Sequence, residues 1–598
     1  MNRIVVQLIP YVLAGYLLFG WSFATQAQTP TGGNIPSKQS EKLASLDNPS
    51  RDGWDSEVVS DQAKNQLKHI VALLKKSATP HASTLEHYLG AGFQTSHLRP
   101  PTLKQVYESG GIKVHRPESL DQKMPLKGSH GLAQALAELA APFKTGEKIR
   151  IAVKLFGVTM EEQEFTTRSY VETHALLGEA SLQQNTEWRC RWLLPKKDAE
   201  PLLLSIQLVD YEECRIDQKQ GTLFSEVTEA VLGGNASYRD QLRYGSNHWL
   251  TRMDNMLGLD FNSHIGLAVG DANGDGLDDV YLCQGGGLPN RLYLQNADGS
   301  ARDYSKQAGV DWLETSRSAL FLDLDNDGDQ DLIVNTSTNI LLMENNGAAQ
   351  YTVVKRLNSG NNSYALTAID YDGDADLDLY VTNYRGKDDK GEAVPTPIPY
   401  HNANNGGHNM FLENRGNWTF VDITRSLGLD QNNSRFSFAA AWEDYDNDGD
   451  PDLYVANDYG HNNLYRNDNG HFSDVAEEVG LTDSSFGMAV TWGDVNRDGR
   501  SDIHISNMFS AAGSRVTRQA RFKPNETAES RQRYQRLARG NSLFLNGSNN
   551  QFSDVSEAAN ITMGRWSWGA SFADINNDGW EDLVVSNGYI TSYSTDDL

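Results

Sequence analysis

The sequence predicts a mainly β fold, in which a β-propeller of six blades follows a small α+β domain. Three observations predict it. A nine-residue loop rich in aspartate recurs six times in the second part of the chain. Strand-like apolar segments precede and follow each loop. The loops recur at intervals near 50 residues or at longer ones, and about 50 residues is the length of a four-stranded propeller blade. We therefore expect the propeller to occupy residues 236–598.

The N-terminus has the features of a secretory signal peptide. One arginine precedes an apolar run, and small residues suited to cleavage follow at Ala24 and Ala27. An uncleaved membrane anchor is the alternative, although Gln7 and Pro10 interrupt the apolar run. We assign residues 1–27 to the signal and the polar residues 28–55 to a linker. The protein is thus expected to be secreted, periplasmic or cell-surface, with no transmembrane segment after cleavage.

Residues 56–235 are expected to form the small α+β domain. Apolar residues at helical spacing predict a helix over residues 55–78, and alternating segments from residue 148 onward predict an antiparallel sheet with one buried face. Cys190 and Cys214 lie in neighbouring strand-like segments, so the sequence is compatible either with a disulfide bond or with two buried thiols. No motif in this domain indicates chemistry, and its role stays open.

Each repeat unit has the same order of elements: a strand, the loop, a second strand, and then two more strands. In the first strand of each unit an apolar residue two places before the loop is expected to point inward. The last unit stops after its second strand, whereas residues 240–259 resemble the third and fourth strands of other units. We expect this segment to complete the last blade and close the ring, which removes exposed strand edges. Six blades follow by count, or seven if an insertion holds a degenerate blade.

The loops follow the pattern D-x-[DN]-x-D-G-x-x-D, numbered here as positions one to nine. Side-chain oxygens at positions one, three, five and nine, with a backbone carbonyl at position seven, can surround one hard cation, and Ca²⁺ takes six to eight oxygen ligands. About six Ca²⁺ sites are therefore predicted. The expected ligands are Asp271, Asn273, Asp275 and Asp279; Asp323, Asp325, Asp327 and Asp331; Asp370, Asp372, Asp374 and Asp378; Asp444, Asp446, Asp448 and Asp452; Asp494, Asn496, Asp498 and Asp502; and Asp574, Asn576, Asp578 and Asp582.

An EF-hand begins similarly but requires glutamate at position twelve. Here position twelve is always aliphatic and lies in an expected strand, so the EF-hand interpretation fails. Loop three has Ala375 in place of the turn glycine, and Arg497 and Arg500 make loop five the weakest expected site. We expect the cation to stabilise each hairpin rather than to act as a signal. The six loops hold 26 acidic residues, so they account for almost all of the formal net charge of −27, which therefore does not indicate a basic partner.

These strand-loop-strand units resemble the FG-GAP or VCBS repeats of integrin α-subunit propellers. The segment "NNLYRNDNGHFSDVAEEVGL" is similar to the cartilage acidic protein family, whose members often carry an ASPIC/UnbV domain. The resemblance covers residues 240–598. It implies a Ca²⁺-binding β-propeller, usually extracellular, that acts in adhesion or recognition. It identifies no ligand.

Two insertions are the remaining candidate sites. Residues 514–540 hold eight basic residues, which form either a cationic patch for an acidic partner or a solvated helix paired with the acidic propeller. Residues 385–409 carry His401 and His408, a candidate metal pair or simply surface histidines. No catalytic motif is present. The predicted function is non-catalytic recognition or adhesion, with an extracellular or periplasmic protein or an anionic glycan as partner and no nucleic acid. A propeller-based polysaccharide lyase or hydrolase is the alternative.

Overall fold

The computed structural model describes residues 54–76, 80–194, 199–217, 224–245, 248–249, 252–253, 265–336, 338–360, 362–386 and 396–587. The predicted signal peptide and nearly all of the predicted linker lie outside these residues. None of the described helices has the length and apolarity that crossing a bilayer requires.

The N-terminal part is an α+β domain built on one large sheet. Its long strands form an antiparallel meander, and the strand order is β2-β3-β8-β7-β6-β5, with β1 and β4 joined beside β8. The strands are β1 (Leu89–Thr95), β2 (Lys104–Ser109), β3 (Ile112–Arg116), β4 (Leu126–Lys127), β5 (Glu147–Met160), β6 (Glu164–Leu177), β7 (Ala180–Leu193) and β8 (Leu202–Asp217). Helices α3 (Asp55–Lys76) and α4 (Gly128–Ala140) pack on one face of this sheet.

The core of this domain confirms the alternation expected in β7. Trp188, Cys190 and Trp192 are fully buried between the sheet and the helices, whereas Arg189 and Arg191 point outward. The helix expected over residues 55–78 is α3. Burying two indoles and a thiol on one face removes a large apolar area from water, and this burial is the main stabilising contribution of the sheet.

The cysteines are free thiols in this structure. In the register of β7 and β8, Cys190 lies opposite Ile206, whereas Cys214 lies opposite Gln183, so the two thiols are not neighbours. Disulfide formation requires Cα atoms within about 7 Å, so the disulfide alternative is wrong. Of the two thiols, Cys190 is buried as expected, whereas Cys214 is only half-buried. Burial raises the pKa of Cys190 to about 12, which keeps this thiol protonated and unreactive.

The repeat region, residues 265–587, contains five antiparallel sheets of four strands and a sixth of two. The first five are β9 (Leu267–Gly270), β10 (Asp279–Leu282), β11 (Arg291–Gln295) and β12 (Ala301–Asp303); β13 (Ser316–Leu322), β14 (Asp331–Thr336), β15 (Asn339–Glu344) and β16 (Thr352–Asn358); β17 (Ser363–Ile369), β18 (Asp378–Asn383), β20 (Met410–Asn414) and β21 (Phe420–Asp422); β23 (Ser437–Glu443), β24 (Asp452–Asn457), β25 (Asn463–Asn467) and β26 (Phe472–Asp474); and β27 (Gly487–Gly493), β28 (Asp502–Asn507), β29 (Ser542–Asn546) and β30 (Phe552–Asp554). The sixth is β31 (Ser567–Ala573) with β32 (Asp582–Asn587), and β19 (Gly407–His408) pairs separately with β22 (Ser434–Arg435).

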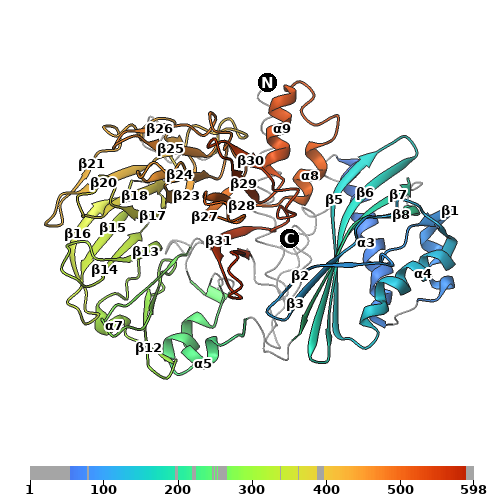
Figure 1. Ribbon diagram of the computed structural model, residues 1–598, viewed down its shortest axis with the longest axis horizontal. Coiled ribbons are helices and arrows are strands. Elements are labelled where there is room, and N and C mark those ends of the chain that lie inside the picture. Colours follow the sequence, from blue (N-terminus) through green and yellow to red (C-terminus); the bar gives the residue numbers. More distant parts are fainter. Residues whose placement is uncertain are drawn as a thin grey trace.

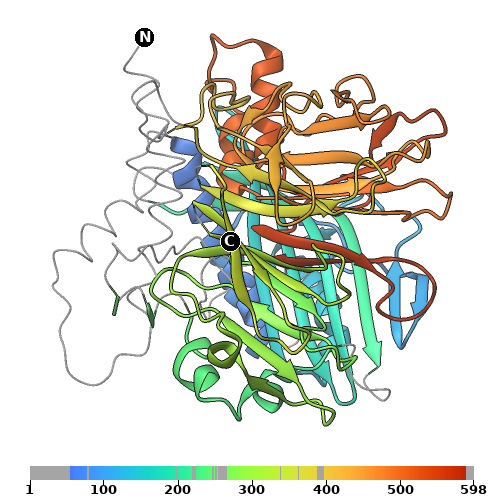
Figure 2. The same ribbon diagram turned by 90° about the vertical axis from the view of Figure 1, so that its left-hand side faces the viewer.

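The first strands of successive sheets lie against one another in chain order, from β9 through β13, β17, β23 and β27 to β31. The sheets therefore follow one another like blades, with a buried apolar cluster between each pair from the first to the fifth. Figure 1 shows this array beside the N-terminal domain, and Figure 2 shows it from the side away from that domain. Every residue at loop position twelve lies in a second strand, as the sequence predicts.

Two expectations about the ends of the array are wrong for the described residues. Residues 240–259 were expected to supply the third and fourth strands of the last unit, and half of them lie outside the described residues. Their described start belongs to a helical turn, Tyr238–Leu242, in which Gln241 donates to the Pro289 carbonyl; the preceding Ser237 bonds to Tyr293 of the first sheet, not to the last sheet. Val269, expected to point into the core, is 55% exposed, because β9 has no neighbouring sheet on its outer side among the described residues. Among the residues that the structure describes, no strand pairing closes the array into a ring.

The insertion between β28 and β29 connects the two parts of the molecule. It forms helices α8 (Ala511–Thr517) and α9 (Ala528–Leu537), and Figure 1 shows both between the repeat sheets and the N-terminal domain. The Arg515 guanidinium lies 2.5 Å from the Glu57 carboxylate of α3 and also donates to the Leu155 carbonyl at 2.8 Å. Gln519 donates to Ser56, and Arg521 lies over the Trp54 ring at 4.2 Å. The insertion thus fixes the N-terminal domain against the fifth sheet.

Candidate metal centres in six aspartate-rich loops

The aspartate at position one organises the backbone of every loop. One of its carboxylate oxygens accepts the N–H of position five at 2.9–3.1 Å, and the other accepts the N–H of position six at 2.7–3.1 Å. A short side chain that bonds amides four and five residues ahead holds the chain in a closed turn. The residues concerned are Asp271, Asp323, Asp370, Asp444, Asp494 and Asp574.

Positions five and nine complete this template. The position-five carboxylate accepts the N–H of position seven in all six loops. In loop four, the buried Asp452 at position nine accepts the N–H of Tyr445 at 3.2 Å and that of Asn467 at 2.7 Å. Position nine therefore ties the loop to the end of the third strand of its own sheet, an arrangement repeated in the other four-stranded sheets.

Two residues in each loop adopt the left-handed conformation. They are positions four and six, with φ between 56° and 98°. Position six is glycine in five loops, as the pattern predicts, but Ala375 takes this conformation in loop three with φ of 72°. An alanine in this region is strained by contact of its Cβ with the backbone. The need for a left-handed residue at position four, mostly asparagine or glycine here, was not predicted from the sequence.

The side chains of loops two, three and four converge in a way that suits a cation. Carboxylate oxygens lie within 4.8 Å of one another in three groups, which are Asp323 with Asp325 and Asp331, Asp370 with Asp372 and Asp374, and Asp444 with Asp446 and Asp452. These are positions one, three and nine in loops two and four, and positions one, three and five in loop three. In three of the six loops the structure therefore brings three of the four predicted ligands together as a carboxylate cluster.

The unpaired and closely spaced carboxylate oxygens of these clusters suit a hard cation. At position three, Asp325 Oδ1 and Asp446 Oδ1 are buried and have no hydrogen-bond partner. An unpaired buried carboxylate oxygen is costly, and a cation would satisfy it. Burial, followed by repulsion from Asp446 and Asp448, raises the pKa of Asp452 to about 8, and burial raises that of Asp331 to about 7. A cation bound among these carboxylates would hold them ionised. The loop residues fit Ca²⁺ as oxygen ligands.

Loops one, five and six have asparagine at position three and so present fewer carboxylates. Asn273, Asn496 and Asn576 each turn the amide oxygen toward the position-five N–H at 2.9–3.0 Å. In loop five the Arg500 guanidinium pairs with the position-five carboxylate of Asp498. This ion pair competes with a cation for the same oxygen, in agreement with the expectation that loop five is the weakest site.

Asparagines at the ends of the third strands connect neighbouring loops, which the sequence analysis missed. The Nδ2 atoms of Asn345, Asn414 and Asn546 donate to the carbonyl at position two of the preceding loop at 2.8–3.1 Å. These asparagines are buried and follow the third strand's apolar residues at the same place in each unit. That recurrence was the available signal. Such bonds join loops one, two and three in series and join loop four to loop five.

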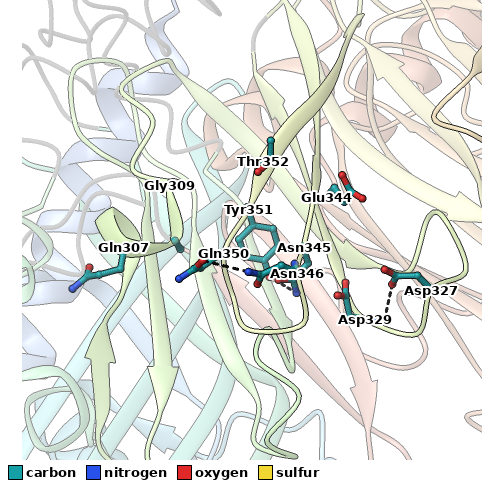
Figure 3. A pocket seen from close by; sticks show the side chains of 11 residues that line it. Gln307, Gly309, Asp327, Asp329, Glu344, Asn345, Asn346, Gln350, Tyr351 and Thr352 are labelled. Carbon is teal, nitrogen blue, oxygen red and sulfur yellow. Dashed lines mark hydrogen bonds between the residues drawn. The ribbon is translucent and has the colours of Figure 1, made fainter.

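A groove opens beside loop two, between the first and second sheets (Figure 3). It has a volume of about 650 Å³, and its lining includes short helix α7 (Ser305–Ala308) and the β15–β16 turn. Figure 3 shows Asp327 and Asp329 at one end, Gln307 at the other, and Tyr351 between them. Asp329 Oδ1 is buried and has no hydrogen-bond partner. The lining contains amides, carboxylates and a phenol but no lysine or arginine.

The described residues of the two insertions do not form the sites that were considered for them. In residues 514–540, Arg536 bonds to Asp483 and Asp554, Arg539 bonds to Asp554, and Arg515 bonds to the N-terminal domain. Several of the basic side chains of this insertion are therefore engaged in ion pairs within the molecule. This favours the interpretation of a helix whose basic residues pair with acidic residues of the repeat region. His401 packs near the Tyr534 ring, His408 is exposed in β19, and neither belongs to a cluster of metal-ligating side chains in the described part of the chain.

The geometry defines a class of protein. It is an array of antiparallel sheets, and in each sheet an aspartate-rich loop suited to a divalent cation joins the first two strands. The units are FG-GAP-like repeats, because the model of that family matches residues 271–334, 323–381, 444–505 and 534–585. None of the curated proteins matches the sequence.

Two solved structures show the extent of structural likeness. The Vibrio cholerae biofilm matrix protein Bap1 is 14% identical, with a TM-score of 0.26, and the match covers 41% of this chain and 35% of that one. A lectin from Agrocybe aegerita, described as recognising non-reducing terminal N-acetylglucosamine, is 16% identical, with a TM-score of 0.31, and the match covers 54% of this chain and 74% of that one. The chain thus spans about a third of the length of the biofilm protein.

Proposed function

We propose that the protein is an exported, Ca²⁺-stabilised β-propeller that acts as a non-catalytic recognition module. The observation that carries the proposal is the groove beside loop two, where polar side chains surround about 650 Å³ on a scaffold of bonded loops. Binding sites for small ligands are concave and have a few well-placed polar groups on rigid elements. The residues that line this groove match that description.

Calcium has a structural role in this proposal. The candidate ligands are the twenty-four residues at positions one, three, five and nine. Cation binding to the folded loops only would stabilise the native state by mass action. Export would place the protein where free Ca²⁺ is abundant, which suits the modest affinity of extracellular sites.

We also propose that the six sheets close into a ring. Support comes from the two end sheets, since Leu267 and Val269 on β9 and Val584 on β32 leave large apolar side chains exposed. Exposed apolar residues on strands at the two ends of an array are expected to pack together or against a covering segment.

A glycan is the partner that the groove favours. Amide groups donate hydrogen bonds to sugar hydroxyls and accept them, and carboxylates accept them. The groove carries Asp327, Asp329 and Glu344 and no basic lining residue, so an uncharged glycan suits it better than the anionic glycan considered from the sequence. A protein ligand is the other outcome of the test below.

The test is a binding screen of neutral and uronic polysaccharides in Ca²⁺, followed by variants. Gln307→Ala and Gln350→Ala each remove one exposed amide from the groove, and Gln532→Ala removes an exposed amide from α9 as a control. Loss of one hydrogen bond of about 1 kcal/mol weakens binding about fivefold. Unchanged affinity in both groove variants, or binding of proteins only, would reject the assignment. Release of shortened or unsaturated sugars in the same samples would instead support the lyase or hydrolase alternative.

A further inference from the structure

The hairpin of β2 and β3 in the N-terminal domain reaches loop six of the repeat region. The Tyr107 hydroxyl donates to Asp578 Oδ2 at 2.8 Å and accepts from Asn576 Nδ2 at 2.8 Å. At the tip of the hairpin, the Cβ of Asn576 lies 3.5 Å from the point where a Cβ on Gly110 would be. The partners of Tyr107 are positions three and five of the loop, so a residue nearly 470 places earlier in the chain joins a candidate cation site.

This contact distinguishes loop six from the others. The position-five aspartate is exposed in loops one to five. In loop six the corresponding Asp578 is half-buried, because the hairpin covers it. In loop one the same two positions bond directly, since Asn273 Nδ2 donates to Asp275 Oδ2 at 3.0 Å. In loop six the Tyr107 hydroxyl bridges the side chains at these two positions.

The Tyr107 hydroxyl holds both candidate ligands from outside the loop, in the orientation that the same two positions also adopt in loops one and five. An asparagine amide can present either its oxygen or its nitrogen, and the hydrogen-bond network decides which. Because Asn576 donates Nδ2 to Tyr107, its Oδ1 points into the loop, where it accepts the N–H of Asp578 at 2.9 Å. Asp578 likewise keeps Oδ1 in the loop, where it accepts the N–H of Trp580 at 2.9 Å.

We propose that Tyr107 is a positioning residue for the sixth cation site, so that cation binding in loop six and docking of the hairpin on that loop strengthen each other. The inference rests on the proposed binding of Ca²⁺ by these loops. Groups that orient metal ligands from outside the coordination sphere commonly change metal affinity 10- to 100-fold when they are removed. Reciprocity follows from linkage: whatever factor docking adds to cation affinity, the cation adds to docking.

Loop six contains its own reporter. Trp580 occupies position seven, and no other loop has a tryptophan within its nine residues. Tb³⁺, which replaces Ca²⁺ in oxygen-rich sites, emits when a nearby indole is excited. Because Arg497 of loop five lies 4.2 Å from the centre of the Trp580 ring, loop five is also near this indole. Emission that disappears in Trp580→Phe but persists in Asp494→Ala therefore belongs to loop six, and its titration gives the affinity of that site alone.

The experiment titrates Tb³⁺, and Ca²⁺ in competition, into the full chain, Tyr107→Phe and the control Tyr88→Phe. Tyr88 is a half-buried tyrosine of the same domain that lies outside the interface, beside His87. We expect Tyr107→Phe to weaken the Trp580-dependent site about tenfold, with the total bound metal at saturation unchanged and Tyr88→Phe like the wild type. Equal affinity in all three proteins would overturn the inference and leave the proposed function intact. Absence of metal from the wild type would overturn both.

Amide hydrogen exchange over residues 104–116 supplies an independent readout of docking. We expect exchange in the wild type to be slower in Ca²⁺ than in chelator, and this difference to shrink in Tyr107→Phe. Exchange that does not respond to Ca²⁺ in the wild type would contradict the proposed linkage, because an ion that binds more tightly to the docked form must favour docking.

Discussion

Asp271→Ala separates the two roles that the structure gives to position one. The carboxylate accepts the N–H of Asp275 at 3.0 Å and that of Gly276 at 2.8 Å, and it is also a predicted cation ligand. The matched control is Asp278→Ala at position eight, which removes one negative charge from the same loop. Asp278 is exposed and takes no part in the bonding shared by positions one, five and nine.

In excess chelator no cation is bound, so Asp271→Ala loses only the two hydrogen bonds from the backbone N–H groups of Asp275 and Gly276. Two hydrogen bonds to a partly exposed carboxylate contribute about 1 kcal/mol each, so the free energy of unfolding should fall by about 2 kcal/mol. With Ca²⁺ at about 100 times the dissociation constant, the wild type gains a further 2.7 kcal/mol or so that this loop of the variant cannot gain. The deficit of Asp271→Ala should therefore grow to about 4 to 5 kcal/mol in Ca²⁺.

The assay is urea or thermal unfolding of the full chain and both variants, each with Ca²⁺ and with excess chelator. Asp278→Ala should stay within about 0.5 kcal/mol of the wild type in both conditions, as surface changes usually do. If the two variants unfold alike in both conditions, charge number rather than position governs the loop, and the reasoning is refuted. A deficit for Asp271→Ala that is equal in both conditions would keep the template but reject the cation.

Three further predictions follow from buried contacts. His504 is fully buried, and burial lowers its pKa to about 4. Between pH 6.5 and 4 the unfolded state therefore binds more protons than the folded state. The free energy of unfolding should fall by about 2 kcal/mol from pH 6.5 to 5. His504→Gln should flatten this pH dependence in unfolding titrations whereas exposed His471→Gln should not, and equal slopes would contradict the assignment. Arg515→Ala leaves the buried Glu57 carboxylate of α3 unpaired, so the free energy of unfolding should fall by about 3 kcal/mol and proteolysis between the two parts should become faster. The exposed Arg518→Ala is the control and should change neither. Identical digestion rates for the two variants would reject the interface. Asn414→Ala removes a buried bond to the preceding loop and should lower the free energy of unfolding by about 1 to 3 kcal/mol, and an unchanged value would show that the loops are independent.

Much of the repeat architecture is predictable from local pattern. Each loop is nine consecutive residues whose hydrogen bonds run mainly within the loop, so position one can be read from spacing alone. The strands on either side are short and apolar, and position twelve falls in a strand in all six units. Alternation likewise predicts the buried face of β7, because side chains on a strand alternate between two faces.

The contacts between distant parts of the chain were not predictable in this way. Arg515 meets Glu57 and Tyr107 meets Asp578 across hundreds of residues, and no periodicity reports such pairs. The basic insertion was considered as a surface patch because its acidic partners lie elsewhere in the sequence. At residues 240–242, similarity to the strands of other units predicted a strand, but these residues belong to a helical turn that bonds to residues of the first sheet and its turn.

The measurement that tests the central claim most directly is bound-metal stoichiometry with a melting curve of residues 28–598, in Ca²⁺ and in excess chelator. The account predicts close to six Ca²⁺ per chain, fewer if loop five is empty, and a melting temperature that drops in chelator by several degrees or more. A melting temperature that is the same in both conditions, or a chain that binds no Ca²⁺, would contradict it: the aspartate loops would then be held by their own hydrogen bonds alone.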